Sequence, residues 1–361
     1  MKMFLIGLAL ASLLFPACST SLPSEVELNN MAQSRTNAAA TPAPVPSVVP
    51  PAPLLSHVDL ELATPVHTIE VSQLGDDIYS AVLPIGLDNK DYYVTGIKIF
   101  GVDTDTNQPT NTLHHAVVFQ IPPTGMTKPK EPSYQGGIMG FYVMGSPILQ
   151  PPSGYGLKLN GKTTLAFTIH FNQAMFMDTS MAPKHVSVHI QFQFASTVNH
   201  LAYYIAGAKA QWKLQPDSML IPANTITTRS ETLDPFRGLP TNSKSLDLLS
   251  VLYHMHNRGI AGQTSTIEKN SSYVVNADDQ FSYANQYFHN LPAPAPLTRN
   301  KTQINFQCTW NNTQPYQPFV YGVQMPVVDV FWGESTVDEM CYHVLLVGEK
   351  GSAGIRKYMM K

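Results

Sequence analysis

The stretch HVSVHIQFQF, residues 185–194, shows the pattern that decides the fold of this chain. It is rich in β-branched and aromatic residues, which favour β-strands, and turn-forming residues flank it. Further runs of the same kind are DYYVTGIKIFGV (91–102), HHAVVFQI (114–121), TTLAFTIHF (163–171), SLDLLSVLYHMH (245–256), SSYVVNA (271–277) and CYHVLLVGEK (341–350). Persuasive amphipathic helices are missing, and 29 residues are proline. The sequence therefore predicts an all-β protein of the β-sandwich or jelly-roll type.

A length of 361 residues is comfortable for two domains with cores of their own. We expect two tandem β-sandwiches over residues 56–197 and 198–352, with the joint near ASTVNHL (195–201) and a short tail over 353–361. No internal repeat is evident in the sequence.

The N-terminal residues MKMFLIGLALASLLFPAC combine a lysine, an apolar run too short to span a bilayer, and small residues before Cys18. This pattern predicts a signal peptide over residues 1–17, with Cys18 as the lipidated residue of a bacterial lipoprotein. The Pro/Ala-rich segment 18–55 is too poor in large apolar residues to form a core, so we expect a disordered linker. The predicted location is periplasmic or at the cell surface, with membrane contact only through the lipid.

Charge and cysteine content narrow the functional classes. The chain has 22 basic and 25 acidic residues, and only 13% of its residues are charged. No basic patch indicates nucleic acid, and no charge run indicates an interaction tail. Three cysteines are present. If Cys18 carries lipid or is removed, Cys308 and Cys341 remain as a pair that can bridge in an oxidising compartment.

Histidine placement indicates metal binding. In a strand, residues i and i+2 face the same side, so His254 and His256 can converge on one metal ion while Met255 points away. His114 and His115 would diverge in a regular strand, so joint ligation requires a strand end, a bulge or different ring nitrogens. The alternative for both pairs is a structural role as half-buried strand histidines.

Apart from these two pairs and His170, we expect the histidines to have a structural role. His185 and His189 share a strand face but have no third ligand near them in the sequence. The isolated histidines are His57, His67, His200, His289 and His343.

The residue types also narrow the metal. Imidazole suits zinc, copper, iron and nickel, whereas an added thioether favours copper, especially copper(I). Met340 lies in GESTVDEMC (333–341), where a methionine could equally be core filler. If it joins His254 and His256, the site has two nitrogens and one sulfur. If His114, His115 and His170 combine, a second site has three nitrogens.

The order of the motifs is more specific than any one of them. LHHAVVF, GSPILQPPSGYGLKL leading into LAFTIHF, VSVHIQF, LAYYIAG, SMLIPANT, HMH, Cys308 and GESTVDEMC follow one another between about residue 90 and about residue 348. In this order the chain resembles the copper type II, ascorbate-dependent monooxygenase family, whose members include peptidylglycine α-hydroxylating monooxygenase and dopamine β-monooxygenase, and it is similar to a bacterial-type member.

The resemblance implies two coppers per chain, one in each β-sandwich domain, on either side of a solvent-filled cleft. It assigns the electron-transfer copper to His114, His115 and His170. It assigns the oxygen-binding copper, and hence catalysis, to His254, His256 and Met340. Ascorbate would be the reductant, O₂ the co-substrate, and hydroxylation of a C–H bond the reaction. The family's second-domain disulfide corresponds to Cys308–Cys341, and VSVHIQF corresponds to a stretch that does not ligate copper.

The substrate motif departs from the family. Where peptide-processing members have an arginine two residues before the His-x-His pair, this chain has Leu252, and their Asn and Tyr after the Met-Cys step correspond to Tyr342 and Val344. Leucine cannot form the bidentate fork that a carboxylate favours, so we expect a small organic substrate rather than a glycine-extended peptide. Arg258 could supply a replacement cation, but we expect it to be a surface residue in a turn.

Two alternatives from other classes remain open. One is an exported copper-binding or copper-sequestering lipoprotein that performs no hydroxylation. The other is an adhesion-type β-sandwich whose histidines are incidental. Copper stoichiometry separates the second alternative from the rest, and a screen for hydroxylated product separates the enzyme from the copper-binding protein.

Overall fold

The structure is a computed structural model that describes residues 55–70, 76–121, 137–145, 148–174, 176, 182–236, 243–269 and 271–350. These residues belong to one compact unit. The predicted signal peptide (1–17), Cys18, nearly all of the linker (18–55) and the tail (353–361) lie outside the described residues.

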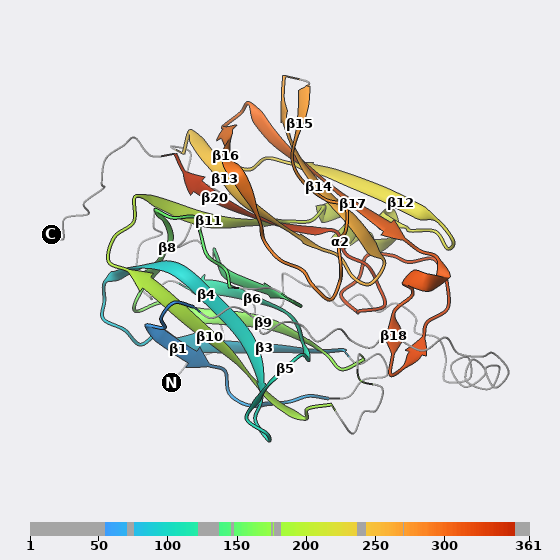
Figure 1. Cartoon of the computed structure of the whole chain (residues 1–361), viewed down its shortest axis with the longest axis horizontal. Coiled ribbons are helices and arrows are strands. Elements are labelled where there is room, and N and C mark those ends of the chain that lie inside the picture. Colours follow the sequence, from blue (N-terminus) through green and yellow to red (C-terminus); the bar gives the residue numbers. More distant parts are fainter. Residues whose placement is uncertain are drawn as a thin grey trace, which may run out of the picture. The chain divides into compact units, whose positions relative to one another are not determined.

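The first half of the described chain forms a β-sandwich (Figure 1). One of its two layers is a four-stranded antiparallel sheet in the order β3 (Asp76–Pro84), β9 (Thr164–Asn172), β6 (Leu113–Ile121) and β7 (Ile138–Val143). The other layer belongs to a larger sheet and contains β1 (Leu60–Ala63), β10 (His185–Ala195), β4 (Asp91–Asp103) and β8 (Tyr155–Asn160), with β2 (His67–Thr68) on β10 and β5 (Gln108–Thr110) on β4.

The stretch HVSVHIQFQF explains how these layers pack. It forms most of β10, whose even-numbered residues Val186, Val188, Ile190 and Phe192 are fully buried in the core between the layers. Successive strand residues point to opposite faces, so the histidines and glutamines of β10 lie on the other face. The predicted strands thus form as expected, and the all-β sandwich prediction is confirmed.

The larger sheet continues past the predicted joint at residues 195–201. After β10 ends at Ala195, β11 (His200–Gly207) pairs in parallel with β8, with His200 opposite Tyr155. The sheet then continues through β20 (Tyr342–Glu349), β13 (Ser245–His254) and β16 (His289–Thr298). The division into domains at 197/198 therefore stays a prediction, because hydrogen-bonded strands cross it.

The second sandwich pairs this part of the sheet with a separate four-stranded sheet (Figure 1). Its order is β12 (Ile226–Leu233), β17 (Thr302–Asn311), β14 (Gly259–Glu268) and β15 (Ser271–Asp278). Phe306 and Trp310 of β17 and Leu345 of β20 lie in the core between the layers. Cys308 and Cys341 form the predicted disulfide in this core, with Cα atoms 5.8 Å apart and neither residue exposed.

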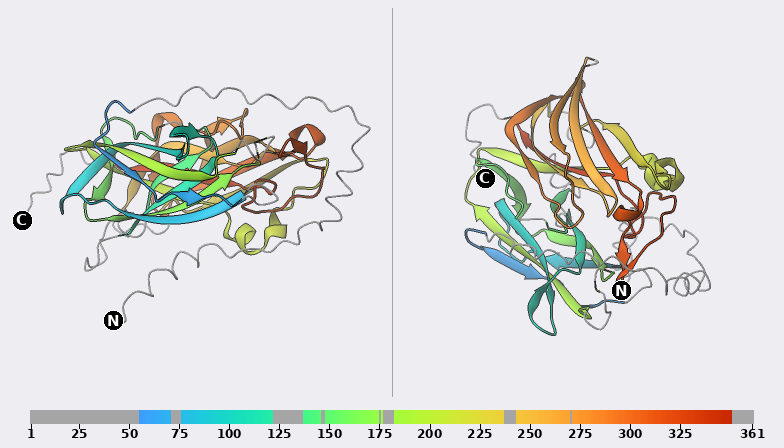
Figure 2. Two further views of the ribbon diagram at one scale, coloured as in Figure 1. Left: turned by 90° about the horizontal axis from the view of Figure 1, so that it is seen from below. Right: turned by 45° about the vertical axis from the view of Figure 1, so that its right-hand side comes forward.

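Short elements complete the described chain. They are the helix α2 (Ala210–Leu214), the 3-10 turns η3 (Pro216–Met219) and η4 (Gln314–Tyr316), and the small hairpin of β18 (Phe319–Val320) and β19 (Val323–Gln324). The helix lies beside the strands of the second sandwich (Figure 2) and buries Trp212 in its core. Among the described residues, no helix has the length and apolar character needed to cross a membrane.

Candidate metal centre

The structure brings five of the six predicted metal ligands into one cluster, which we call the histidine cluster: His114, His115, His170, His254 and His256. The ring centroid of His114 lies 4.8 Å from that of His115 and 4.7 Å from that of His170. It also lies 5.7 Å from the ring of His254 and 5.1 Å from the ring of His256. These residues come from β6, from β9, from the end of β13 and from the segment that follows β13, so both sandwiches contribute to the cluster.

A β-bulge turns adjacent histidines toward the same site. The register between β6 and β9 shifts between Leu113 and His115, and His115 then stands opposite His170. A bulge places two residues against one on the partner strand, so the side chains of His114 and His115 need not diverge. Of the three ways in which this pair could converge, the structure shows the bulge.

The HMH stretch approaches the cluster from the second sandwich. β13 ends at His254, so His256 lies in the turn that follows, and the two rings are 5.3 Å apart. Met255 between them is fully buried in the second core. The side chains thus separate as the i, i+2 rule predicts, with the histidines on one side and the methionine on the other.

Hydrogen-bond partners determine which nitrogen of three rings carries the proton. The amide nitrogen of Gln286 donates to the carbonyl of Tyr283 at 2.9 Å, so the amide oxygen faces His254 Nδ1, which must donate across 2.8 Å. His256 Nδ1 donates to the carbonyl of Asp338 at 3.1 Å, and His170 Nε2 donates to the carboxylate of Asp76 at 2.9 Å. Each ring therefore keeps a lone pair on its other nitrogen, as metal-ligating histidines do.

The nitrogens left over are buried and have no hydrogen-bond partner among the residues that the structure describes. They are His114 Nε2, His115 Nδ1, His254 Nε2 and His256 Nε2. The Nδ1 of His170 is different, because it accepts a hydrogen bond from His114 Nδ1 across 3.2 Å. A buried polar atom without a partner is costly, and such atoms grouped in one place fit a bound ion. The nitrogens of His114, His115 and His254 can all lie within 4.8 Å of one another, close enough to hold a metal ion together.

Electrostatics favour the neutral form of four of these imidazoles, those of His114, His115, His254 and His256. Burial, followed by the neighbouring histidines, lowers the pKa of His114 and of His115 well below its usual value, and burial does the same for His256. Burial lowers the pKa of His254 to about 4, although the hydrogen bond with Gln286 works in the opposite direction. Metal ions bind the neutral form of imidazole, so at neutral pH protons do not compete for these four rings.

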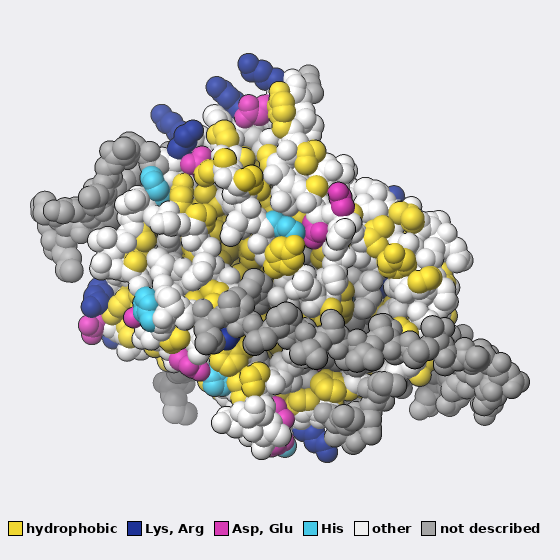
Figure 3. Space-filling view, in the orientation of Figure 1, with side chains coloured by type: hydrophobic (Ala, Val, Ile, Leu, Met, Phe, Trp, Pro, Cys, Tyr) yellow, Lys and Arg dark blue, Asp and Glu magenta, His cyan; other side chains and the backbone are white. Residues whose placement is uncertain are grey.

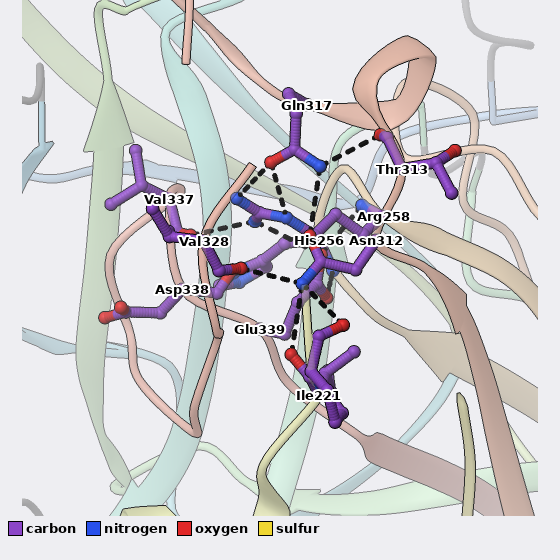
Figure 4. Close-up of polar contacts among 11 residues, drawn as sticks. Ile221, His256, Arg258, Asn312, Thr313, Gln317, Val328, Val337, Asp338 and Glu339 are labelled. Carbon is purple, nitrogen blue, oxygen red and sulfur yellow. Dashed lines mark hydrogen bonds and ion pairs between the residues drawn. The ribbon is translucent and has the colours of Figure 1, made fainter. Parts of the chain in front are cut away.

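A buried polar network holds the HMH turn against the GESTVDEMC segment (Figure 4). The carboxylate of Glu339, which is fully buried, accepts hydrogen bonds from the backbone N–H of His256 at 2.9 Å and of Arg258 at 2.7 Å. The guanidinium of Arg258 donates to the side-chain oxygen of Gln317 and to the carbonyl of Val337. Burial raises the pKa of Glu339 to about 7, against the opposing effects of Arg258 and the two backbone bonds.

The position of Arg258 corrects one expectation. It is 1% exposed and belongs to this network, so the prediction of a surface arginine in a turn is wrong. Its side chain is fully engaged with Gln317 and Val337 and lies beside Glu339, with Nη1 4.0 Å from the carboxylate. Two sequence-distant acceptors and a buried carboxylate account for its burial, and the local sequence NRG does not reveal them.

Met340 lies next to Glu339 and is buried, 6% exposed, in the second core. Glu339 accepts a hydrogen bond from the backbone N–H of His256, and Met340 is the next residue in the chain. The backbone at Met340 is therefore linked to the HMH turn through Glu339. The disulfide of Cys341 restrains the other side of Met340. The structure thus places the predicted thioether ligand beside the anchor of His256.

The two predicted ligand sets are not separated in this structure. The rings of His115 and His254 are 5.3 Å apart, and His114, His254 and His256 are at most 2% exposed. This arrangement differs from the expected pair of sites across a solvent-filled cleft. The physical reason is a set of contacts between the halves beside the cluster, among them the hydrogen bond from Gln286 N to the carbonyl of Met144 at 2.9 Å.

Other histidines named in the sequence analysis have partners outside the histidine cluster. His189 pairs with Glu61 and Ser187, and His185 pairs with Asp105. Cys308, Cys341 and His343 are close enough to hold an ion, but the two sulfurs are bonded to each other.

Two of the three positions that differ from the family's substrate motif are buried and do not reach solvent. Leu252 and Val344 are fully buried. Tyr342 is half-buried, and its ring stacks on Phe141 with centroids 6.1 Å apart. Phe141 in turn lies 6.4 Å from His254, which makes these two aromatic rings part of the surroundings of the cluster.

Sequence reasoning missed four residues around the cluster: Asp76, Tyr283, Gln286 and Glu339. The ring of Tyr283 lies 5.3 Å from that of His114, and Gln286 and Asp76 hold ligand rings in place. Only Glu339 carried a local signal, because it is an acidic residue next to a candidate ligand in a chain poor in charge. The others come from distant segments that pairing brings together.

The surface agrees with the neutral composition. On the face shown in Figure 3 the charged side chains are sparse and of both signs, so a nucleic-acid interface receives no support from it.

Comparisons with known proteins report only distant likeness. No protein-family model matches the chain, and no curated protein matches it. Among solved structures, the major capsid protein P2 of bacteriophage PM2 is 9% identical over 82% of this chain and 100% of its own, with a TM-score of 0.29. A putative secreted protein from Parabacteroides distasonis is 10% identical over 83% of this chain and 93% of its own, with a TM-score of 0.22.

Proposed function

We propose that this chain is a copper-dependent monooxygenase that hydroxylates a C–H bond of a small organic substrate with O₂ and ascorbate. The observation that supports this most directly is the histidine cluster, with four buried, partnerless ring nitrogens contributed by both halves of the chain. The resemblance of the ordered motifs to the copper type II, ascorbate-dependent monooxygenases supports the choice of reaction.

The donor set favours copper among the metals that imidazole binds. Neutral imidazoles suit copper, zinc, iron and nickel, and a thioether from Met340 would shift the preference to copper. Copper, when bound, would supply the one-electron chemistry with O₂ that protein side chains lack. His114, His115 and His170 would hold one ion, and His254, His256 and Met340 the other.

The chain's own residues would orient and protect the metal site. Asp76, Gln286 and the carbonyl of Asp338 fix three of the rings by accepting their N–H groups. Burial of the cluster limits access of water. The stacked rings of buried Phe141 and half-buried Tyr342 make the surroundings of His254 apolar and aromatic, which fits a small organic substrate better than a peptide carboxylate.

The proposed reaction is tested by a search for hydroxylated products. Copper-loaded protein is mixed with ascorbate and a library of small aromatic and aliphatic compounds, and products are sought by mass spectrometry as a gain of one oxygen. We expect an ascorbate-dependent product that Met340→Ile abolishes while the copper at His114, His115 and His170 is retained. Normal turnover by Met340→Ile would contradict the assignment.

A second candidate function is copper binding or sequestration without hydroxylation. The enclosure of the cluster favours it, because His114, His170, His254 and His256 are each at most 2% exposed. This function predicts tight copper binding and no product in the same screen.

Both candidates include export. The signal peptide and the lipid on Cys18 would place the folded body outside the cytoplasm, in an oxidising compartment that suits the Cys308–Cys341 disulfide. Labelling of expressing bacteria with a radioactive fatty acid tests the anchor, which Cys18→Ala should remove.

A further inference from the structure

Asp76, the first residue of β3, makes further contacts besides the hydrogen bond from His170 that the proposed function uses. Its Oδ1 atom accepts hydrogen bonds from His170 Nε2 at 2.9 Å and from the amide of Asn172 at 2.9 Å. The same atom accepts from the hydroxyl of Thr336 at 2.7 Å. Its Oδ2 atom accepts from the hydroxyl of Ser335 at 2.6 Å and from the backbone N–H of Thr336 at 3.2 Å.

These donors belong to two distant parts of the chain. His170 and Asn172 lie on β9 of the first sandwich, next to β3. Ser335 and Thr336 lie in the GESTVDEMC segment, which continues to Met340 and Cys341 in the second sandwich core. Asn172 also donates directly to the hydroxyl of Thr336. One carboxylate therefore joins a ligand histidine of one predicted set to the segment that carries the methionine of the other.

The site around Asp76 is built for a carboxylate anion. Its two oxygens accept five hydrogen bonds, which come from His170, Asn172, Ser335 and Thr336. Hydrogen bonds to a charged acceptor are roughly twice as strong as neutral ones, so this cluster of donors holds its residues firmly.

We propose that Asp76 is a positioning residue for both halves of the metal centre: it orients His170 and at the same time fastens the Ser335–Thr336 segment that precedes Met340. The orientation of His170 toward a metal rests on the proposed function, whereas the fastening of the segment does not. A residue shared in this way couples the two sets, because an ion held by His170 favours the same carboxylate position that orders the segment.

The inference is tested with Asp76→Asn and a matched control on the same strand, Asp77→Asn. Asp77 also pairs with a histidine, His67 Nε2 at 2.7 Å, but that histidine lies outside the cluster. A third variant, Ser335→Ala, removes one hydrogen bond of the segment and leaves the pair of Asp76 and His170 intact. This variant keeps the inference testable if Asp76→Asn does not fold.

The first readout is amide hydrogen exchange of residues 335–340 in the full, metal-free chain, so it does not depend on copper binding. We expect Asp76→Asn to speed exchange of this segment by about 10–100-fold, and Ser335→Ala to speed it by a smaller factor. The Asp77→Asn control should leave it unchanged. Wild-type exchange in both Asp76→Asn and Ser335→Ala would overturn the fastening role.

The second readout is copper affinity, measured by competition with a chelator, together with the Cu(II) EPR spectrum. We expect Asp76→Asn to weaken binding by about 10–100-fold and to alter the EPR signature of the histidine-bound ion, while Asp77→Asn changes neither. An unchanged affinity and spectrum in Asp76→Asn would overturn the orienting role. If the wild-type chain bound no copper, the proposed function would fail, and the exchange data would still decide the fastening role.

Discussion

The buried pair of Arg258 and Glu339 makes a quantitative prediction about how the HMH turn is held. Arg258→Met would take the guanidinium away from the fully buried carboxylate of Glu339, which would keep the backbone N–H groups of His256 and Arg258 as donors. Glu339→Gln would remove the carboxylate that lies 4.0 Å from the buried guanidinium, and it would place the amide N–H₂ against one of the two backbone N–H donors. Above the pKa of about 7 to which burial raises Glu339, breaking this buried ion pair from one side costs about 3–5 kcal/mol of unfolding free energy, because a charge then stays buried and unpaired.

The double variant separates pairing from packing. Replacing both residues removes both charges, so we expect it to cost less than the sum of the two single variants by about 1–3 kcal/mol. Urea unfolding followed by tryptophan fluorescence measures this, since Trp212, Trp310 and Trp332 are all buried in the second core.

A control pair in the same half of the chain sets the scale. Lys209 and Glu231 lie 3.3 Å apart but are about one-third exposed, with relative side-chain exposures of 32% and 28%. The corresponding variants, Lys209→Met and Glu231→Gln, should each cost at most about 1 kcal/mol. Additive effects of Arg258→Met and Glu339→Gln, within about 0.5 kcal/mol, would refute the account of the network as one interacting unit.

Three further predictions concern other parts of the molecule. Gln286→Leu removes the acceptor that orients His254 and should weaken copper binding about 10–100-fold in a chelator competition, and unchanged affinity would contradict the orienting role. Burial lowers the pKa of His343 to about 3, so the folded state does not take up the proton that the unfolded state binds below about pH 6.5. Stability therefore falls as the pH falls, and the wild type should lose about 2 kcal/mol more than His343→Leu between pH 7.5 and pH 5 in urea unfolding; parallel pH curves would contradict this. Replacing Cys308 and Cys341 by serine should lower the unfolding free energy by roughly 3–4 kcal/mol for a separation of 33 residues, and a loss below about 1 kcal/mol would contradict the constraint on the unfolded chain.

The sequence predicts the fold class well because strand runs are local signals. The predicted run 163–171 corresponds to β9 and the run 245–256 to β13, each within a few residues. Sheet order is different, because it depends on pairing between distant segments. The parallel pairing of β8 with β11 leaves no mark in either strand, and it carries the sheet across the predicted domain joint.

The candidate ligands could also be predicted, because the residue types and their spacing along one strand are local features of the sequence. The way in which these ligands group in space could not be predicted. The family resemblance assigns His115 and His254 to different sites, whereas the structure puts their rings 5.3 Å apart. Asp76 and Gln286 were invisible for the same reason, because the histidines they orient come from other strands. The bulge at His114 was an open alternative that only the β6–β9 register could decide.

The central claim is that the histidine cluster binds copper, and metal content after copper loading and dialysis tests it most directly. The wild-type chain should retain two coppers. A variant with His254 and His256 both replaced by alanine should retain one, and a variant that also lacks His114 and His115 should retain none, with each variant's fold checked by circular dichroism. A wild-type chain that retained no copper would contradict the claim and leave an adhesion-type β-sandwich with incidental histidines.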